Sequence, residues 1–219
     1  MMCPMPRTTA TRLPEKMSDD RAELERLLAD VVVGHVGLVD DDGHPVVIPT
    51  AVVLDGDRLL LHGSSGSRWM RRLATGVPVS VAVTSIDGVV VARTAFESSL
   101  SYRSAVFFGS CRAVPADGQE EALAVVTERL VPGRVAEVRG STRRELAATL
   151  VLELAVTDWS LRVSTGPPTD EPEDVAGPAW AGNLAIERRY AVPAPSPDLR
   201  PGIPVPEPVR AMAEREHRV

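Results

Sequence analysis

The 219-residue sequence contains only two cysteines, too few for a disulfide framework and not spaced as metal ligands. Cys3 lies near the start of the chain, whereas Cys111 lies inside an apolar run, where we expect a core residue. No apolar run is long enough to cross a bilayer, and no apolar stretch follows the basic residues of the N-terminus. We therefore expect a cytoplasmic protein.

Positive charge is not in excess either. The chain has 24 Lys and Arg residues against 30 Asp and Glu residues, which gives a formal net charge of -6. Its basic residues are not gathered in one part of the sequence, so such a chain repels nucleic acid and anionic lipid. We expect neither a nucleic-acid partner nor a membrane partner.

Composition divides the chain into three parts. We expect a disordered N-terminus over residues 1–12, a main domain over 13–163 and an extended tail over 164–219 that packs on the main domain or on a partner chain. The tail holds 11 of the 19 prolines. Because proline lacks a backbone N–H group, regular structure there should be short.

Short β-rich segments separated by turn residues dominate the main domain. We predict strands over 31–39, 45–54, 58–62, 77–86, 89–96, 105–114 and 151–163, and helices over 21–30, 68–74, 117–130 and 141–150. Ser18 or Asp19 is the expected N-cap of the first helix, and Ser141-Thr142 with Glu145 three to four residues further on predicts a capping box. The Asp87-Gly88 pair predicts a turn. The connections are too short for repeated βαβ units, so we predict a mainly β fold, a small barrel with peripheral helices.

The most informative stretch is His62-Gly63-Ser64-Ser65-Gly66-Ser67-Arg68, where a strand ends and a helix begins. Glycines let backbone N–H groups approach a phosphate, the helix start adds partial positive charge, and a guanidinium can hold two phosphate oxygens. The alternative is a simple turn in which a serine caps the helix. Phosphate contacts alone are too weak to hold a cofactor, so a ligand with a phosphate and a large flat apolar part fits better.

Several other site types lose support from the same residues. The turn lacks the lysine of a P-loop and the G-x-G-x-x-G spacing, and Ser67 stands where a nucleophile elbow needs glycine. Three histidines, His35, His44 and His62, lie on or beside strands without partners at zinc-ligand spacing, so no metal is expected. His62 is either a structural histidine or a contact to the phosphate. No carboxylate pair suits acid-base catalysis; Asp87 and Glu97 come nearest.

Three further features leave two interpretations open. The polar loop Ser98–Ser104 is rich in hydrogen-bond donors and either meets a ligand at the sheet rim or is a solvated connection. Arg93 is predicted mid-strand, as an edge charge or as a ligand contact. Pro49 interrupts a strand, which marks an edge or a bulge.

Five blocks together resemble one known family. They are Val-Ile-Pro-Thr at 47–50, Leu-His-Gly-Ser-Ser-Gly-Ser-Arg at 61–68, Thr-Ser-Ile-Asp-Gly-Val-Val-Val-Ala-Arg at 84–93, Ser-Tyr-Arg-Ser-Ala-Val-Phe-Phe-Gly at 101–109 and Thr-Gly-Pro-Pro at 165–168. From about 13 to 206 the chain resembles bacterial pyridoxamine 5'-phosphate oxidase-related flavin-nucleotide-binding proteins, a group similar to nitroimidazole-resistance proteins. The resemblance implies a six-stranded antiparallel Greek-key split barrel and a homodimer with two FMN sites at the subunit interface.

The resemblance also implies the cofactor contacts. Pro49 and Thr50 would lie along the isoalloxazine ring. The phosphate end would be held by His62, Ser64, Ser67 and Arg68, and the pocket completed by Tyr102, Arg103, Ser104 and a tail residue, Trp180, of this chain or its partner. Arg188-Arg189-Tyr190 departs from the C-terminal Arg-x-His-type pattern of true pyridoxamine phosphate oxidases, which argues against vitamin B6 oxidation.

The functional prediction is an FMN-dependent oxidoreductase that acts on a small aromatic, heteroaromatic or nitroaromatic molecule with a nicotinamide donor. The flavin would transfer electrons or hydride, so the chain needs no acid-base pair of its own. Two alternatives stay open at this point. One is a non-catalytic barrel that binds flavin, haem or deazaflavin; the other is a structural dimer with an empty pocket.

Overall fold

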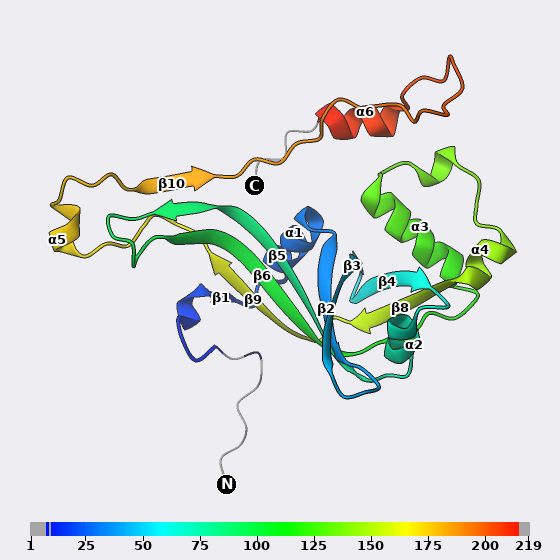
Figure 1. The fold of residues 1–219 in the computed structure, drawn as a ribbon, viewed down its shortest axis with the longest axis horizontal. Helices are drawn as coiled ribbons and strands as arrows, with labels where there is room; N and C mark the ends of the chain where they lie inside the picture. The colour runs from blue at the N-terminus through cyan, green and yellow to red at the C-terminus, as the bar shows by residue number, and fades with distance from the viewer. Residues whose placement is uncertain (1–7, 9, 215–219) are drawn as a thin grey trace, which may run out of the picture.

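The structure is a computed structural model that describes Thr8 and residues 10–214, and one large antiparallel sheet dominates it (Figure 1). Ten strands of the described chain form this sheet, in the order β1-β9-β6-β5-β2-β3-β4-β8-β7, with β10 paired to β5. The strands are β1 Met17–Ser18, β2 Val33–Val39, β3 Pro45–Asp55, β4 Arg58–Ser64, β5 Pro78–Val91, β6 Ser99–Ser110, β7 Arg112–Ala113, β8 Thr149–Ala155, β9 Asp158–Ser164 and β10 Gly182–Ala185. The pairing order does not return to its start, so the sheet is not closed.

The predicted mainly β, antiparallel fold with peripheral helices is confirmed, although the sheet has more strands than the six expected. The helices are α1 Arg21–Asp30, α2 Arg68–Ala74, α3 Gln119–Leu130, α4 Arg143–Ala148, α5 Pro172–Val175 and α6 Glu207–Glu214, with short 3-10 turns at Pro14–Lys16 and Val135–Glu137. No helix in the described part of the chain is long and apolar enough to span a membrane.

One face of the sheet carries the core. Along one row of cross-strand neighbours, Val36 pairs with Ile48 on β3 and with Val81 on β5, and Val81 pairs with Phe107 on β6. Val36, Val81 and Phe107 are fully buried. Since alternate residues of a strand point to opposite faces, the neighbours of these residues in sequence lie on the other face. We call that other face, on strands β3, β2, β5, β6 and β9, the outer face.

The helix ends show where local sequence decides the structure. Asp20, not Ser18 or Asp19, caps α1, because its side chain accepts a 2.8 Å hydrogen bond from the N–H group of Ala22. Ser18 instead donates to Glu23 inside the helix. The predicted capping box of α4 is confirmed, with Thr142 and Glu145 bonded in both directions.

The predicted turn at Asp87-Gly88 is wrong. β5 runs straight through it, with only a shift of register against β6 between Ile86 and Gly88. Gly88 does not have the positive φ of a tight hairpin turn, and the Asp87 carboxylate is bonded to side chains on β5 and β6. The chain turns further on, after Ala92, where Phe96 is almost fully exposed.

Two other predictions along the chain need correction. The serine-rich segment predicted as a loop belongs to β6 from Ser99 onward, because its residues continue the ladder with β5. The single strand predicted over 151–163 is two strands, β8 and β9, separated by a turn at Val156 and Thr157. The two do not pair with each other, because β8 pairs with β4 and β7, and β9 pairs with β6 and β1. This turn lacks the residues that usually mark one, such as Gly, Pro or Asn. Instead, Val156 is buried and its N–H group donates a hydrogen bond to the Asp57 carbonyl.

The tail lies along the outside of the molecule, from α5 through β10 to α6 (Figure 1). Asp170 fastens its start, because its fully buried carboxylate accepts hydrogen bonds from the backbone N–H group and the guanidinium of Arg93. Arg93 therefore lies just beyond the end of β5 and not mid-strand as predicted. β10 then pairs with residues 88–91 of β5. The predicted disordered N-terminus falls mostly on residues 1–7 and 9, which lie outside the described residues, as does Cys3; Cys111 is buried as expected.

Candidate functional site

The predicted anion turn lies where β4 ends and α2 begins. The N–H group of Gly66 donates to the Ser64 hydroxyl at 3.2 Å, and the N–H group of Ser67 donates to the Ser64 carbonyl at 3.0 Å. Ser67 is the N-cap of α2, yet its hydroxyl makes no capping hydrogen bond. Ser65 is held by the carbonyls of Ala147 and Ala148 at the end of α4. The turn is therefore ordered by its own bonds while the Ser67 hydroxyl stays available to a ligand.

Three arginines of α2 stand beside this turn, Arg68, Arg71 and Arg72. With Asp41 and Thr75 they line a hollow of about 280 Å³. Arg72 pairs with Asp41 at 3.3 Å, but Arg68 and Arg71 make no ion pair with any described residue. Residues three and four apart share one side of a helix, so the two unpaired guanidinium groups face the same region. We call this region the cationic mouth.

An apolar wall adjoins the cationic mouth. Arg68 and Arg72 also line a second hollow, of about 250 Å³, whose apolar residues are Leu38, Val46, Ile48 and Trp69. Asp40 belongs to the same hollow, and hydrogen bonds from the backbone N–H groups of His44 and Asp42, helped by the charge of Arg68, lower the pKa of its carboxyl. The two adjoining hollows thus combine unpaired positive charge with an apolar wall.

Pro49 and Thr50, predicted to touch the flavin ring, lie in β3 directly after Ile48 of this wall. Pro49 pairs with His35 and Thr50 with Gly34 of β2, so their side chains point to opposite faces of the sheet. β4 pairs with β3 only from Val52 onward, which confirms that Pro49 occupies an edge position on that side. Pro49 is exposed on the outer face.

His62 lies apart from the cationic mouth. It shares one face of β4 with Leu60, which packs against α3 together with Val151, the partner of His62 on β8. Its ring is partly buried, and the Nδ1 atom is buried without a hydrogen-bond partner. The structure therefore does not bring this imidazole to the residues that line the hollows with Arg68.

Arg103 is engaged by two carboxylates. Its Nε and Nη2 atoms donate to Asp87 at 2.8 and 2.9 Å, and its Nη1 atom contacts Asp30 at 2.9 Å. Burial alone would raise the pKa of the Asp87 carboxyl, but hydrogen bonds from Arg103 and Ser85 outweigh burial and lower that pKa. The same bonds raise the pKa of Arg103. This guanidinium joins α1 to β5 and β6, and its contact with a cofactor remains a prediction.

Tyr102 and Ser104 flank Arg103 on β6 but point to the outer face. Tyr102 pairs with Ser164, and Ser104 with Arg162, both on β9. Trp180 lies elsewhere, in the tail just before β10, where it is 70% exposed and its ring covers Gly182. The predicted site residues therefore occupy five places: the turn beside the cationic mouth, the outer face, the opposite face of the sheet with Thr50 and Arg103, the α3 side of β4, and the tail.

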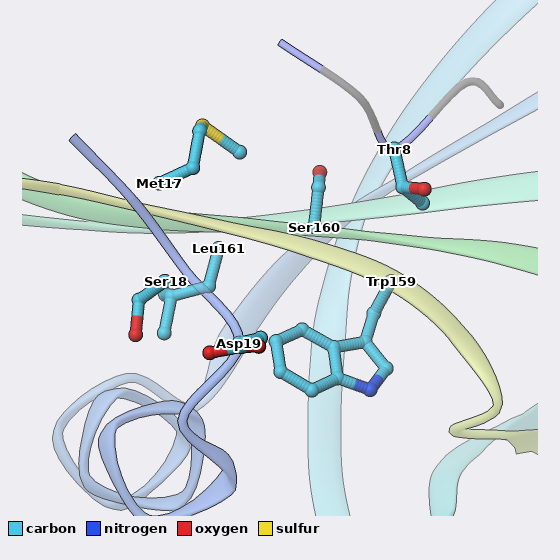
Figure 2. Close-up of a pocket in the computed structure, with 7 residues that line it drawn as sticks. All are labelled: Thr8, Met17, Ser18, Asp19, Trp159, Ser160 and Leu161. Atoms are coloured by element: carbon cyan, nitrogen blue, oxygen red, sulfur yellow. The ribbon is translucent and has the colours of Figure 1, made fainter. Parts of the chain in front are cut away.

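A separate hollow of about 440 Å³ lies at the edge of the sheet, beside β1 and β9 (Figure 2). Its lining includes Trp159, Met17 and Asp19, and Figure 2 shows the Trp159 indole beside Asp19. None of the predicted site residues lines it. Within Thr8 and residues 10–214, no group of three or more His, Cys, Asp or Glu side chains is placed to hold a metal ion.

Sequence reasoning missed Arg71 and Arg72, although their spacing from Arg68 in a short predicted helix could have revealed them. It also missed the outer face as a unit. His35, Pro49, Ala82, Val106 and Ser160 form one continuous row across five strands. A residue's neighbours on other strands depend on register, which the sequence does not display.

The fold is an antiparallel split barrel whose sheet is not closed, and unpaired arginines stand at one hollow of it. The sequence model of the pyridoxamine 5'-phosphate oxidase family matches residues 20–163, so the chain belongs to that family. No curated protein sequence matches it.

Several solved structures are also similar to this chain. The FAD and haem binding protein from Mycobacterium smegmatis is 47% identical, with a TM-score of 0.88 over 90% of this chain and 97% of that one. The flavocytochrome Anf3 from Azotobacter vinelandii is 31% identical, with a TM-score of 0.88 over 94% of this chain and 96% of that one. A 5-nitroimidazole antibiotic resistance protein, so described, from Bacteroides thetaiotaomicron is 17% identical, with a TM-score of 0.56 over 67% of this chain and 86% of that one, and shares the fold.

Proposed function

We propose that this chain is a flavin-binding redox protein. The observation that carries the proposal is the cationic mouth, where the unpaired Arg68 and Arg71 adjoin the apolar wall of Leu38, Ile48 and Trp69. A flavin nucleotide has an anionic phosphate and a flat apolar ring system, which match these two surfaces. The family and the name of the 47% identical relative support the same conclusion.

Of the flavins, we propose FAD in place of the FMN that the sequence resemblance implies. The relative that matches this chain from the barrel into the tail is named for FAD, whereas the family model ends at residue 163. FAD carries a second phosphate and an adenosine, and a surface with two unpaired guanidinium groups can receive more than one phosphate. Mass spectrometry of the molecule released by heat separates FAD from FMN.

We propose a homodimer in which two copies enclose the flavin. The tail exposes apolar side chains that a monomer leaves in water and a partner copy would cover, including Val192 at 90%, Trp180 at 70% and Leu184 at 65%. Burial of apolar surface favours association. Sedimentation of the purified protein, with and without flavin, tests this part.

The bound flavin would supply the electron or hydride transfer. The chain's own residues would bind the phosphates at the mouth, hold the ring against Ile48 and Trp69, and exclude water from one side of it. Turnover of a small aromatic or nitroaromatic molecule with a nicotinamide donor is the catalytic form of this proposal, and an assay of nicotinamide oxidation with such acceptors tests it.

A second cofactor, haem, is a further candidate, because two relatives at least 31% identical to this chain are named for haem or as a flavocytochrome. The chain offers an imidazole, which is a common ligand of haem iron. His35 is exposed at the centre of the outer face, with its ring open to a ligand.

The flavin proposal is tested by titration of apoprotein with FAD and FMN, followed by flavin fluorescence. Loss of one hydrogen bond to a phosphate costs about 1.5–3 kcal/mol, so Arg68→Ala and Arg71→Ala should each weaken binding about tenfold or more. Arg210→Ala removes the same charge from the exposed surface of α6, which lies far from α2 (Figure 1), and should bind as the wild type does. Equal affinity for all four proteins would refute the cationic mouth as the flavin site.

A further inference from the structure

His35 occupies an unusual position for a histidine. It lies in β2, which has β3 on one side and β5 on the other, and its side chain is exposed on the outer face. Its direct cross-strand neighbours are Pro49 and Ala82. A side chain in a strand stands roughly perpendicular to the sheet, so this imidazole projects from the middle of a flat surface.

The surface around His35 is small and apolar. Val33 and Gly37 flank it along β2, and Val106 follows Ala82 along the row on β6. These residues make a platform without bulky polar side chains next to the ring. Such an exposed, apolar surround suits a large planar apolar ligand.

Positive charge lies on the same face at the far edge of the platform. Arg162 on β9 belongs to the row next to that of His35, opposite Ser104. Three strand spacings, about 14 Å in all, separate β2 from β9. Lys16 lies beside this edge, with its amino group 3.5 Å from the Ser164 hydroxyl. Neither cation forms an ion pair with any residue in the described ranges, and Nε of Arg162 is buried without a partner.

The two other histidines in the described part of the chain lack this setting. His44 lies in the turn between β2 and β3, where its side chain is 77% exposed and its Nδ1 atom is 3.8 Å from Asp40. His62 faces the α3 side of β4. Of the histidines that the structure describes, His35 alone combines an exposed ring with an apolar surround and cations along the same face.

We propose that His35 is the axial ligand of a haem bound on the outer face and that Arg162 and Lys16 receive its propionates. Imidazole is a common ligand of haem iron, the platform suits the apolar part of the porphyrin, and a guanidinium binds carboxylates in a bidentate manner. The binding is non-covalent, because the sequence has no Cys-x-x-Cys-His motif. This proposal rests on the haem part of the proposed function and extends it by assigning residues.

The first test is titration of the full-length, flavin-loaded protein with haem, followed by the Soret band. His35→Ala should weaken haem binding at least tenfold and change the Soret position, while flavin content stays the same. Free imidazole added to His35→Ala should restore the wild-type spectrum, because it can occupy the space that the side chain leaves. His44→Ala, the control, should match the wild type.

The second test addresses the propionates. Arg162→Ala should weaken binding of haem several-fold but leave binding of haem dimethyl ester, which has no free carboxylates, unchanged. An equal loss for both ligands would mean that Arg162 acts only on the shape of the site, and would overturn its assignment.

These outcomes separate the two proposals. Wild-type protein that binds flavin but no haem, or a His35→Ala protein that titrates as the wild type does, would overturn the haem assignment and leave the flavin proposal standing. Protein that binds haem through His35 but binds no flavin would overturn the flavin proposal and leave the haem assignment standing.

Discussion

Arg103 on β6 and Asp87 on β5 are joined by two nearly parallel hydrogen bonds, Nε to Oδ2 at 2.8 Å and Nη2 to Oδ1 at 2.9 Å. Both side chains are mostly buried, with 16% and 11% of their surfaces exposed. The pair sits where β5 shifts register against β6, at the point predicted to be a turn. This bidentate contact therefore helps to hold a long strand together at its irregular point.

Removal of Arg103 should destabilise the fold. In Arg103→Ala, the Asp87 carboxylate stays buried without its partner, which we expect to lower the free energy of unfolding by about 3 kcal/mol. Urea unfolding followed by circular dichroism measures the change. Arg134→Ala, which removes a more exposed pair with Glu137, should cost at most about 1 kcal/mol. Similar losses in both variants would contradict a special role for the Arg103–Asp87 pair.

The contribution of Asp87 should depend on pH in one direction. Because its pKa is lower in the folded state, ionised Asp87 stabilises the fold above the pKa of the unfolded chain, about 3.9. That stability is lost as the pH falls through the lower folded-state pKa. The difference in unfolding free energy between wild type and Asp87→Asn should therefore be constant from about pH 5 upward and shrink below about pH 4. A difference that grew on acidification would disprove the assignment; Asp117→Asn is the exposed comparison.

Cys111 should be chemically inert in the folded protein. Burial raises the pKa of its thiol to about 11, so the reactive thiolate is scarce near neutral pH. In a Cys3→Ser background, a thiol reagent such as dithionitrobenzoate should label Cys111 only after urea unfolds the chain. Rapid labelling of the native protein would show that the thiol is accessible.

The contact between the tail and β5 can be tested at Gly88. A Cβ atom there would lie 2.6 Å from the Leu184 carbonyl, closer than side chains tolerate. Gly88→Ala should therefore loosen β10 and speed protease cleavage near residues 182–186, with little change in the core. Gly118→Ala, where a Cβ meets Val114 at an ordinary 3.5 Å, serves as control. Unchanged cleavage would mean that β10 does not depend on this close approach.

The sequence predicted elements well where the pattern is local. α2 has its predicted bounds and α4 its capping box, because spacing and capping involve residues a few positions apart. The predictions failed where the conformation of a segment depends on its partners on neighbouring strands. Asp87-Gly88 has turn chemistry, yet Arg103 and Ser85 satisfy the carboxylate within the sheet. Ser99 and Tyr102 look like loop residues, yet they complete a ladder with β5.

The candidate site was likewise predictable only where its residues are close together in the sequence. The turn from Ser64 to Arg68 carries a local pattern, and the structure places it beside a cationic mouth. His62 follows it in sequence but points to the α3 side of β4, because neighbouring strand residues alternate between faces. His35 was a histidine without partners in the sequence, and only the register of β2 with β3 and β5 reveals its platform.

β10 lies along a stretch of β5 that carries Val89, Val90 and Val91, three consecutive β-branched residues without charge. Beyond the reach of β2, this rim would otherwise present unpaired amide and carbonyl groups, a template on which foreign strands can add. By pairing with this edge, the tail should reduce aggregation of the protein. A shortened chain that ends with the barrel should precipitate during expression even though every residue of its core is intact.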